Sequence, residues 1–225
     1  MKLLKCKFTT TSTHKSSLNY LLSLPREYDN SNKNWPLILF LHGVGERGEN
    51  LEIVKKHGIP KIVSEKEDFP FITVSPQCPE DSIWDRELEI LYQLIQDIVK
   101  NYDIDVSRIY LTGISMGGYG TWCLADKYPS LFAALIPICG VSLPLAKFRS
   151  GMPQLKNTPV WVFHGAKDDA VPIHHSEEMV KLLHHVGGKV KFTIYPHLGH
   201  DSWTRTYENE EIYDWLLNQL NEEFA

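Results

Sequence analysis

Short apolar runs rich in β-branched and aromatic residues alternate with helical stretches from about residue 36 to the end of the chain. This alternation predicts an α/β fold with a mostly parallel central sheet and helices on both faces. Near-continuous apolarity in the middle runs indicates strands that are buried on both sides. Parallel strands are predicted at residues 37–41, 71–75, 108–112, 134–139, 160–163 and 190–195.

An upstream run at residues 18–24 alternates imperfectly between apolar and polar positions, which suits an antiparallel edge strand ahead of the parallel set. The longest connection, residues 140–158, has room for a pocket wall or a short helix but not for a cap domain. Apolar residues spaced by three and four positions mark amphipathic helices. Helices are predicted at residues 87–100, 117–128, 175–185 and 207–220.

Composition and charge agree with the predicted α/β fold and indicate which partners to expect. The 225 residues are 43% hydrophobic and 23% charged, which is close to average globular usage and predicts one α/β domain over residues 1–225. Lys and Arg number 23 against 28 Asp and Glu, which gives a net charge of −5. The overall field therefore repels phosphate backbones and anionic membrane surfaces, and neither nucleic acid nor a membrane is expected as a partner.

The four cysteines, Cys6, Cys78, Cys123 and Cys139, lie far apart and form no CxxC pair. Four cysteines are too few for a disulfide framework in a chain that is long enough to form a hydrophobic core, so we expect reduced thiols. The first residues lack the apolar core of a signal peptide, and no apolar run reaches 18 residues. A cytoplasmic protein is expected, with secretion left open in case a leader has been removed.

A GxSxG motif at residues 113–117 (GISMG) follows the predicted strand at 108–112 and opens a helical stretch. This context of strand, sharp turn and helix is the one that a GxSxG motif requires in order to present a nucleophilic serine. The turn is strained, and side chains at Gly113 or Gly117 would collide with neighbouring elements. Ser115 is therefore predicted to be a nucleophile at a helix N-terminus that favours developing negative charge. An ordinary glycine-rich turn is the alternative.

A serine hydroxyl needs a base to take its proton and an acid to hold that base. Asp168 and Asp169 follow the predicted strand at 160–163, and His200 follows the strand at 190–195. The chain order serine, aspartate, histidine is the one expected for this kind of fold. A triad of Ser115, Asp168 and His200 is therefore predicted.

The segment at residues 42–45 (HGVG) directly follows the predicted strand at 37–41. Its glycines let a backbone N–H turn toward the oxygen of a tetrahedral intermediate, and the residue after the nucleophile supplies a second donor. The amides of Val44 and Met116 are the predicted oxyanion hole. His42 is predicted to be structural, because the mechanism needs only one base.

Five segments carry a family resemblance: HGVGERG, SPQCP, GISMGGYGTW, HGAKDDAVP and GHDSW. Together they resemble the α/β-hydrolase superfamily over roughly residues 18 to 220. More narrowly, they are similar to the small esterases grouped with dienelactone hydrolases, polyhydroxybutyrate-depolymerase-like esterases and predicted peptidases of the prolyl-oligopeptidase type. In the family pattern HGxxDxxVP the acid is the fourth residue after the histidine, which selects Asp168 and leaves its neighbour Asp169 as the alternative.

Three further side chains are candidates for substrate contact. Gln77 and Trp84 follow the strand at 71–75 toward the predicted active face, and Trp203 comes just after His200. Plain packing is the alternative for both tryptophans. The histidine pairs at 174–175 and 184–185 lack HExxH spacing, so no metal site is predicted.

These residues predict a serine carboxylesterase that hydrolyses small or aryl esters through an acyl-enzyme, with no metal or organic cofactor. The alternative is a feruloyl or acetyl-xylan esterase acting on plant polysaccharide esters, with a thioesterase or a small peptidase ranked below it. A binding protein on an inactive hydrolase scaffold belongs to another class, and the presence of all three triad residues argues against it. The expected partner is a small-molecule ester, and a homodimer is left open.

Overall fold

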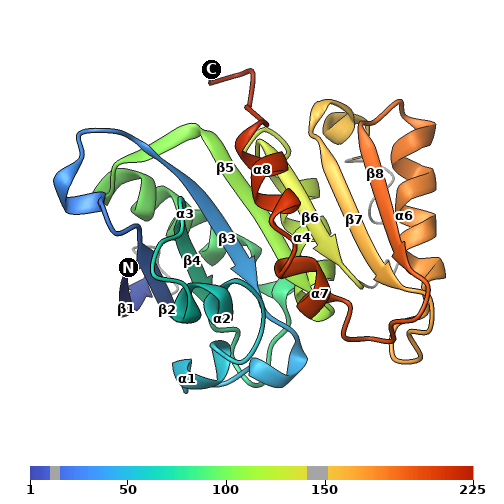
Figure 1. Cartoon of the computed structure of the whole chain (residues 1–225), viewed down its shortest axis with the longest axis horizontal. Helices are drawn as coiled ribbons and strands as arrows, with labels where there is room; N and C mark the ends of the chain where they lie inside the picture. The colour runs from blue at the N-terminus through green and yellow to red at the C-terminus, as the bar shows by residue number, and fades with distance from the viewer. Residues whose placement is uncertain (11–15, 141–151, 225) are drawn as a thin grey trace.

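The computed structural model describes residues 1–10, 16–140 and 152–224. Eight strands form one sheet in the order β1-β2-β4-β3-β5-β6-β7-β8 (Figure 1). The six strands from β3 to β8 run parallel to one another, while β2 pairs antiparallel with both β1 and β4. The predicted mostly parallel sheet is confirmed. The strands are β1 Lys2–Thr9, β2 Ser17–Leu24, β3 Trp35–Leu41, β4 Ile72–Pro76, β5 Ile104–Ile114, β6 Ala134–Ile138, β7 Val160–Gly165 and β8 Val190–Tyr195.

Helices cover both faces of this sheet. In β3, Leu37 and Leu39 belong to one hydrophobic cluster and Ile38 and Phe40 to another, because successive side chains of a strand point to opposite faces. The first cluster includes residues of α3, α4 and α6, and the second includes residues of α2, α7 and α8, the three helices in front of the sheet in Figure 1. The helices are α1 Leu51–Val54, α2 Gly58–Glu65, α3 Leu88–Asn101, α4 Met116–Lys127, α6 His174–His185, α7 Trp203–Tyr207 and α8 Glu211–Leu217; the 3₁₀ turns are η1 Tyr28–Asn30, η2 Val44–Glu46, η3 Trp84–Arg86 and η4 Met152–Asn157.

The expectation that residues 18–24 form the edge of the sheet is wrong. They form β2 with the expected antiparallel direction, but β1 pairs with β2 on its outer side. Six of the eight positions of β2 are buried, whereas β1 carries lysines at exposed positions. Lysine on a strand discourages pairing with another chain, so β1 is the strand suited to an edge.

The bounds of the helix predicted at residues 207–220 are also wrong, because α7 ends at Tyr207 and α8 covers only Glu211–Leu217. The side-chain oxygen of Asn209 accepts a hydrogen bond from the Glu211 N–H at 3.1 Å. Such a local bond gives the backbone an alternative to a continuous helix, so α7 ends and α8 begins afresh. The predicted connection at 140–158 ends in η4, and its residues 141–151 lie outside the described residues.

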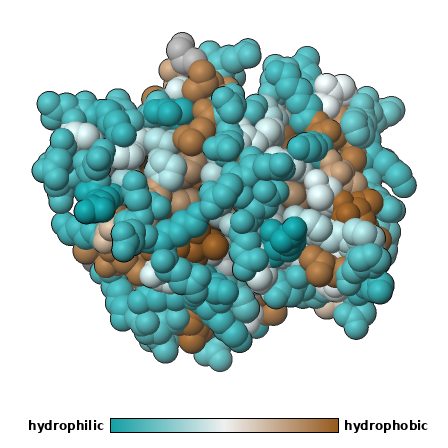
Figure 2. All heavy atoms as spheres, viewed as in Figure 1, coloured by the Kyte–Doolittle hydropathy of each residue, from teal (hydrophilic) through white to brown (hydrophobic). Residues whose placement is uncertain are grey.

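Among the described residues, no helix combines the length and the apolarity needed to cross a membrane. On the face seen in Figure 2, hydrophilic residues cover most of the surface and hydrophobic residues show as separate patches. Scattered apolar patches of this kind are normal for a globular surface.

Candidate active site

The site begins at the sharp turn between β5 and α4. Ser115 has φ 52° and ψ −114°, in a left-handed region that L residues rarely adopt. Its N–H donates to Ile138 O at 3.0 Å on the neighbouring β6. A Cβ on Gly117 would lie 1.9 Å from Leu41 O, so the first turn of α4 packs directly on the backbone of β3. Strain of about 1 to 3 kcal/mol is held here by the surrounding backbone, and it lifts the hydroxyl off the end of the sheet.

His200 bridges the serine and the predicted acid. Its Nε2 lies 2.9 Å from Ser115 Oγ, and its Nδ1 lies 2.7 Å from Asp168 Oδ2. Because a carboxylate only accepts, Nδ1 carries the proton and Nε2 is free to accept from the serine hydroxyl. The three residues therefore form a continuous line in the order expected for general-base activation of a nucleophile.

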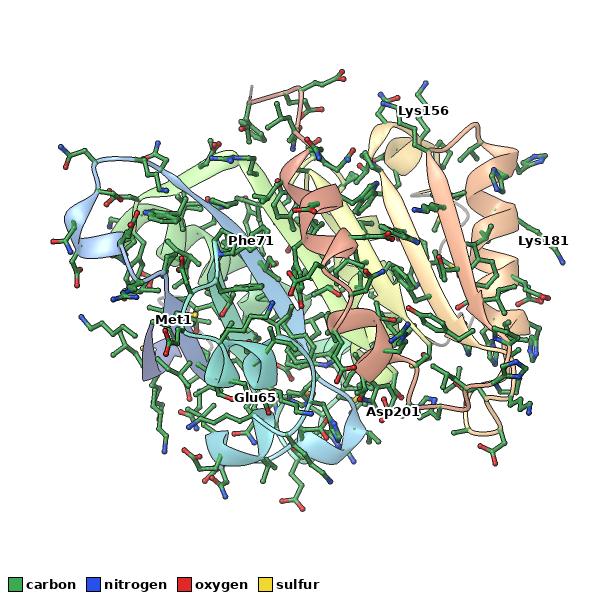
Figure 3. The ribbon with its side chains drawn as sticks, in the orientation of Figure 1. Met1, Glu65, Phe71, Lys156, Lys181 and Asp201 are labelled. Atoms are coloured by element: carbon green, nitrogen blue, oxygen red, sulfur yellow. The ribbon has the colours of Figure 1, made fainter. Side chains whose placement is uncertain are left out.

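Backbone pairing between two loops brings the acid and the base together. The Ala166 N–H donates to Tyr195 O and the Lys167 N–H donates to Leu198 O, both at 2.9 Å, which joins the loop after β7 to the loop after β8. A Cβ on Gly165 would lie 2.2 Å from the backbone oxygen of Gly199, so only glycine permits this approach. Figure 3 labels Asp201, next to His200 in the chain, below the ends of β7 and β8.

Asp168 and Asp169 occupy different environments. The Asp168 side chain has no exposed surface, and its Oδ1 accepts from the N–H groups of Ala170 at 3.0 Å and Val171 at 2.8 Å. Its Oδ2 is thereby left to His200. Asp169 is exposed, and no hydrogen bond in the described part of the chain connects it to His200. The geometry therefore pairs His200 with Asp168 and not with its neighbour.

The predicted oxyanion donors lie at the ends of β3 and β5. Val44 begins the 3₁₀ turn η2, and Met116 is the first residue of α4. Within the described residues, neither amide donates to a carbonyl or a side chain. Helix starts leave such N–H groups unpaired, so both amides are available to an external oxygen.

Hydrogen bonds from side chains hold the backbone of residues 42–50, the predicted oxyanion loop. His42 donates from Nδ1 to Gly43 O at 2.6 Å and accepts at Nε2 from the Cys78 N–H at 3.0 Å. Burial lowers the pKa of His42 to about 4, so the imidazole is neutral and keeps one tautomer. Arg47 donates to Val44 O at 3.2 Å from its Nε. The structure thus gives His42 a supporting position in the loop.

Gln77 and Trp84 support the same loop instead of lining a substrate site. Trp84 has no exposed surface, and its Nε1–H donates to His42 O at 2.9 Å. Gln77 is 2% exposed and donates from Nε2 to Glu46 O and to Asn50 O. Both expectations of substrate contact are corrected, because the side chains face the protein interior. Their proximity to the active face along the sequence could not reveal this orientation.

Trp203 remains beside the reactive residues. Its ring is partly buried and meets the His200 ring edge-on, with centroids 5.2 Å apart. On another side it contacts His57, at a centroid distance of 5.6 Å. The sequence analysis gave His57 no role, because this histidine belongs to none of the predicted elements or motifs. The two rings form an aromatic wall next to His200, suited to contact a flat apolar group.

One group of side chains in the described residues has the donor atoms for a metal ion: Cys139, Asp168 and His200, with ligand atoms within 4.8 Å of one another. The imidazole and the carboxylate are already hydrogen-bonded to each other at 2.7 Å. Burial raises the pKa of the Cys139 thiol to about 12, and a protonated thiol is a poor ligand. The chemistry of this donor set therefore does not fit a resident metal.

A sequence model of the phospholipase/carboxylesterase family matches residues 65–216 of the chain. Acyl-protein thioesterase 1 homolog 2 of Dictyostelium discoideum is 27% identical over 207 residues, covering 81% of this chain and 92% of that protein. The bifunctional acetylxylan esterase/xylanase XynS20E of Neocallimastix patriciarum is 29% identical over 153 residues, which cover 66% of this chain and 21% of that protein.

A solved structure also resembles this chain. The crystal structure of a thermostable esterase superimposes with a TM-score of 0.80 at 34% identity, covering 96% of this chain and 63% of the esterase. The chain thus spans about a fifth of the Neocallimastix protein and less than two thirds of the esterase. With the parallel sheet and its helices, these matches show the α/β-hydrolase fold, and the described residues contain no cap domain.

Proposed function

The chain belongs to the phospholipase/carboxylesterase family, a family of carboxylic ester hydrolases, and we propose that it is a serine carboxylesterase acting on small or aryl esters. The observation that carries this proposal is the position of His200, 2.9 Å from Ser115 Oγ and 2.7 Å from Asp168 Oδ2. A base held between a nucleophile and a carboxylate is the arrangement that acyl transfer requires.

In the proposed mechanism, His200 Nε2 takes the Ser115 proton as the oxygen attacks the ester carbonyl. The amides of Val44 and Met116 donate to the resulting oxyanion, while Asp168 stabilises the imidazolium. The imidazolium gives its proton to the leaving alcohol, and the acyl-enzyme remains. His200 then removes a proton from water, which attacks the acyl carbonyl, and Ser115 recovers its proton as the acid leaves.

The size class of the substrate follows from what surrounds His200. The described residues contain no cap domain that would enclose a long acyl chain. The aromatic wall of Trp203 and His57 offers ring edges to a flat group at one side of the base. Small and aryl esters fit these surroundings better than long aliphatic esters.

An acetylxylan esterase is the second candidate, favoured by the 29% identity to a protein named as an acetylxylan esterase/xylanase. An acetyl ester on a polysaccharide requires the same acyl transfer, with a different leaving alcohol. Values of kcat/KM on p-nitrophenyl esters of increasing acyl length, methyl ferulate, acetylated xylan and an acyl thioester distinguish the candidates. A preference for one polysaccharide ester by orders of magnitude would replace the generalist proposal.

A cytoplasmic location belongs to the proposal as well. All four cysteines are free, and three of them are buried. Unpaired thiols are typical of proteins in a reducing compartment, although a core of this size is stable without disulfides. Fractionation of the native host, with detection by antibody, tests this part of the proposal.

Covalent labelling tests the nucleophile. A fluorophosphonate reacts with an activated serine, so we expect one adduct per chain, at Ser115, and none in Ser115→Ala. Mass spectrometry of the intact protein counts the adducts, and peptide mapping locates them. Label at a different serine, or no label in a folded protein that hydrolyses esters, contradicts the proposed mechanism.

A further inference from the structure

A second histidine, His164, lies beside Asp168. His164 is near the end of β7 and has no exposed surface. Its Nε2 lies 2.8 Å from Val171 O and 3.1 Å from Asp168 Oδ2, and its Nδ1 lies 2.7 Å from Ser176 Oγ. Carbonyl and carboxylate oxygens only accept, so Nε2 carries the proton and Nδ1 accepts from the serine hydroxyl. One neutral tautomer therefore makes the hydrogen bonds to Val171 O and Ser176 Oγ and leaves Nε2 in close contact with Asp168 Oδ2.

The surroundings keep this imidazole neutral. Burial lowers the pKa of His164, against the opposing attraction of Val171 O and Asp168. The titratable groups that face it are Asp168 on the β7 loop, His200 on the β8 loop and His175 on α6. A positive charge on His164 would compete with the imidazolium that forms on His200 for the same carboxylate.

The contacts of His164 fix the loop that carries Asp168. The loop at residues 168–171 folds back so that the Val171 N–H donates to Asp168 Oδ1 at 2.8 Å, while the carbonyl of the same residue accepts from His164. Ser176 near the start of α6 holds the other edge of the ring. The histidine thus connects a strand, a loop and a helix, and it presents a partial positive charge to the oxygen that serves His200.

We propose that His164 is a positioning residue for the triad, a neutral imidazole whose Nε2–H, oriented by Ser176, fixes the Asp168 loop and balances the charge on Asp168 Oδ2. This inference rests on the proposed function, because it assigns to Asp168 the task of orienting the base. His164 touches no reacting atom in this role. Its effect passes through Asp168 to His200.

The kinetic test compares a variant that removes the donor with one that restores it. In His164→Leu combined with Ser176→Ala, no hydroxyl is left unpaired, and we expect kcat on p-nitrophenyl acetate to fall by about 10- to 100-fold while KM changes less than about threefold. We also expect the acid limb of the kcat/KM profile to move to higher pH. An Asp168 carboxylate that loses a nearby donor attracts the His200 Nδ1 proton more strongly.

His164→Gln provides the matched rescue. A glutamine amide can place an N–H near the position of Nε2, so we expect it to recover most of kcat and the wild-type acid limb. Tyr110→Phe is the stability control, because it removes a buried hydroxyl that donates to Gln219 O at 3.0 Å far from the triad. That variant is expected to lose stability without a change in kcat or in the pH profile.

Nitrogen NMR of the wild-type protein separates this inference from the proposed function. We expect ¹⁵N shifts of His164 to report one neutral tautomer, protonated at Nε2, between pH 7 and pH 8. A charged ring, a protonated Nδ1, or wild-type kcat in His164→Leu with Ser176→Ala overturns the positioning role. Loss of kcat with an unmoved acid limb and no recovery in His164→Gln also overturns it. A wild-type protein that hydrolyses no ester, with His164 neutral as expected, refutes the proposed function instead.

Discussion

At the scale of single residues, identical side chains take different roles when the backbone turns between them. Asp168 accepts from two backbone amides and from His200, and its carboxylate is fully buried. Asp169 points to solvent one residue later. A buried carboxylate with this number of donors is held in one orientation, whereas an exposed one is free to rotate.

Exchange of each carboxylate for an amide tests this difference. Asp168→Asn offers an N–H where His200 needs an acceptor, so we expect kcat to fall by at least about 100-fold, as the wrong imidazole tautomer costs up to about 10⁴ in a serine protease. Asp169→Asn is expected to lose less than about tenfold, because Asp169 has no contact with the base. Steady-state kinetics on both variants, with circular dichroism as a check of folding, measures the effect. A larger loss in Asp169→Asn would move the acid by one residue.

At the scale of elements, the site depends on how closely α4 approaches β3. The helix begins directly after Ser115, and its residue Gly117 lies against the backbone of Leu41. Direct backbone contact leaves no flexible atom that could give way. The glycines of the elbow are therefore required by packing between two elements as well as by the conformation of the turn.

We expect Gly117→Ala to destabilise the protein by more than about 3 kcal/mol, above the usual range for overpacking, because its Cβ would lie 1.9 Å from Leu41 O. Gly45→Ala is the matched control, since its Cβ would meet nothing within 4 Å, and a change below about 1 kcal/mol is expected. Urea unfolding monitored by tryptophan fluorescence gives both values. Equal stability of the two variants would show that α4 can shift away from β3 at little cost.

At the scale of the whole molecule, buried neutral histidines make folding sensitive to acid. Burial lowers the pKa of His42 to about 4, and it lowers the pKa of His164 as well. Below about pH 6.5 both histidines are protonated in the unfolded chain, whereas in the native protein they stay neutral to a lower pH. The free energy of unfolding therefore falls as the pH decreases from about 6.5 toward 4, and the loss attributable to His42 is complete below that range.

His42 alone is expected to cost about 2 kcal/mol of stability between pH 7 and pH 5. In His42→Gln, an amide oxygen can accept from the Cys78 N–H without titrating. We therefore expect the free energy of unfolding of this variant to be lower at pH 7 and to depend less on pH. Urea unfolding of both proteins at pH 7, 6 and 5 measures the slopes. Identical slopes would mean that His42 is protonated equally in the native and unfolded states.

Much of the fold and of the candidate site could be predicted from the sequence. The six parallel strands, three of the four predicted helices and the α/β-hydrolase fold agree with the sequence pattern, because apolar periodicity records which residues face the core. The turn at Ser115 was also predictable, since its glycines reflect a local steric demand. The distances from His200 to Ser115 and Asp168 are those that the predicted roles require.

Only the tertiary structure decided which side chains turn inward. Gln77 and Trp84 follow a strand that leads to the active face, yet packing against the oxyanion loop buries both. The outer position of β1 and the contact of His164 with Asp168 likewise depend on segments that meet only after folding. Local sequence determines backbone conformation and the reactive groups available, whereas the direction a side chain faces depends on distant neighbours that compete for the same space.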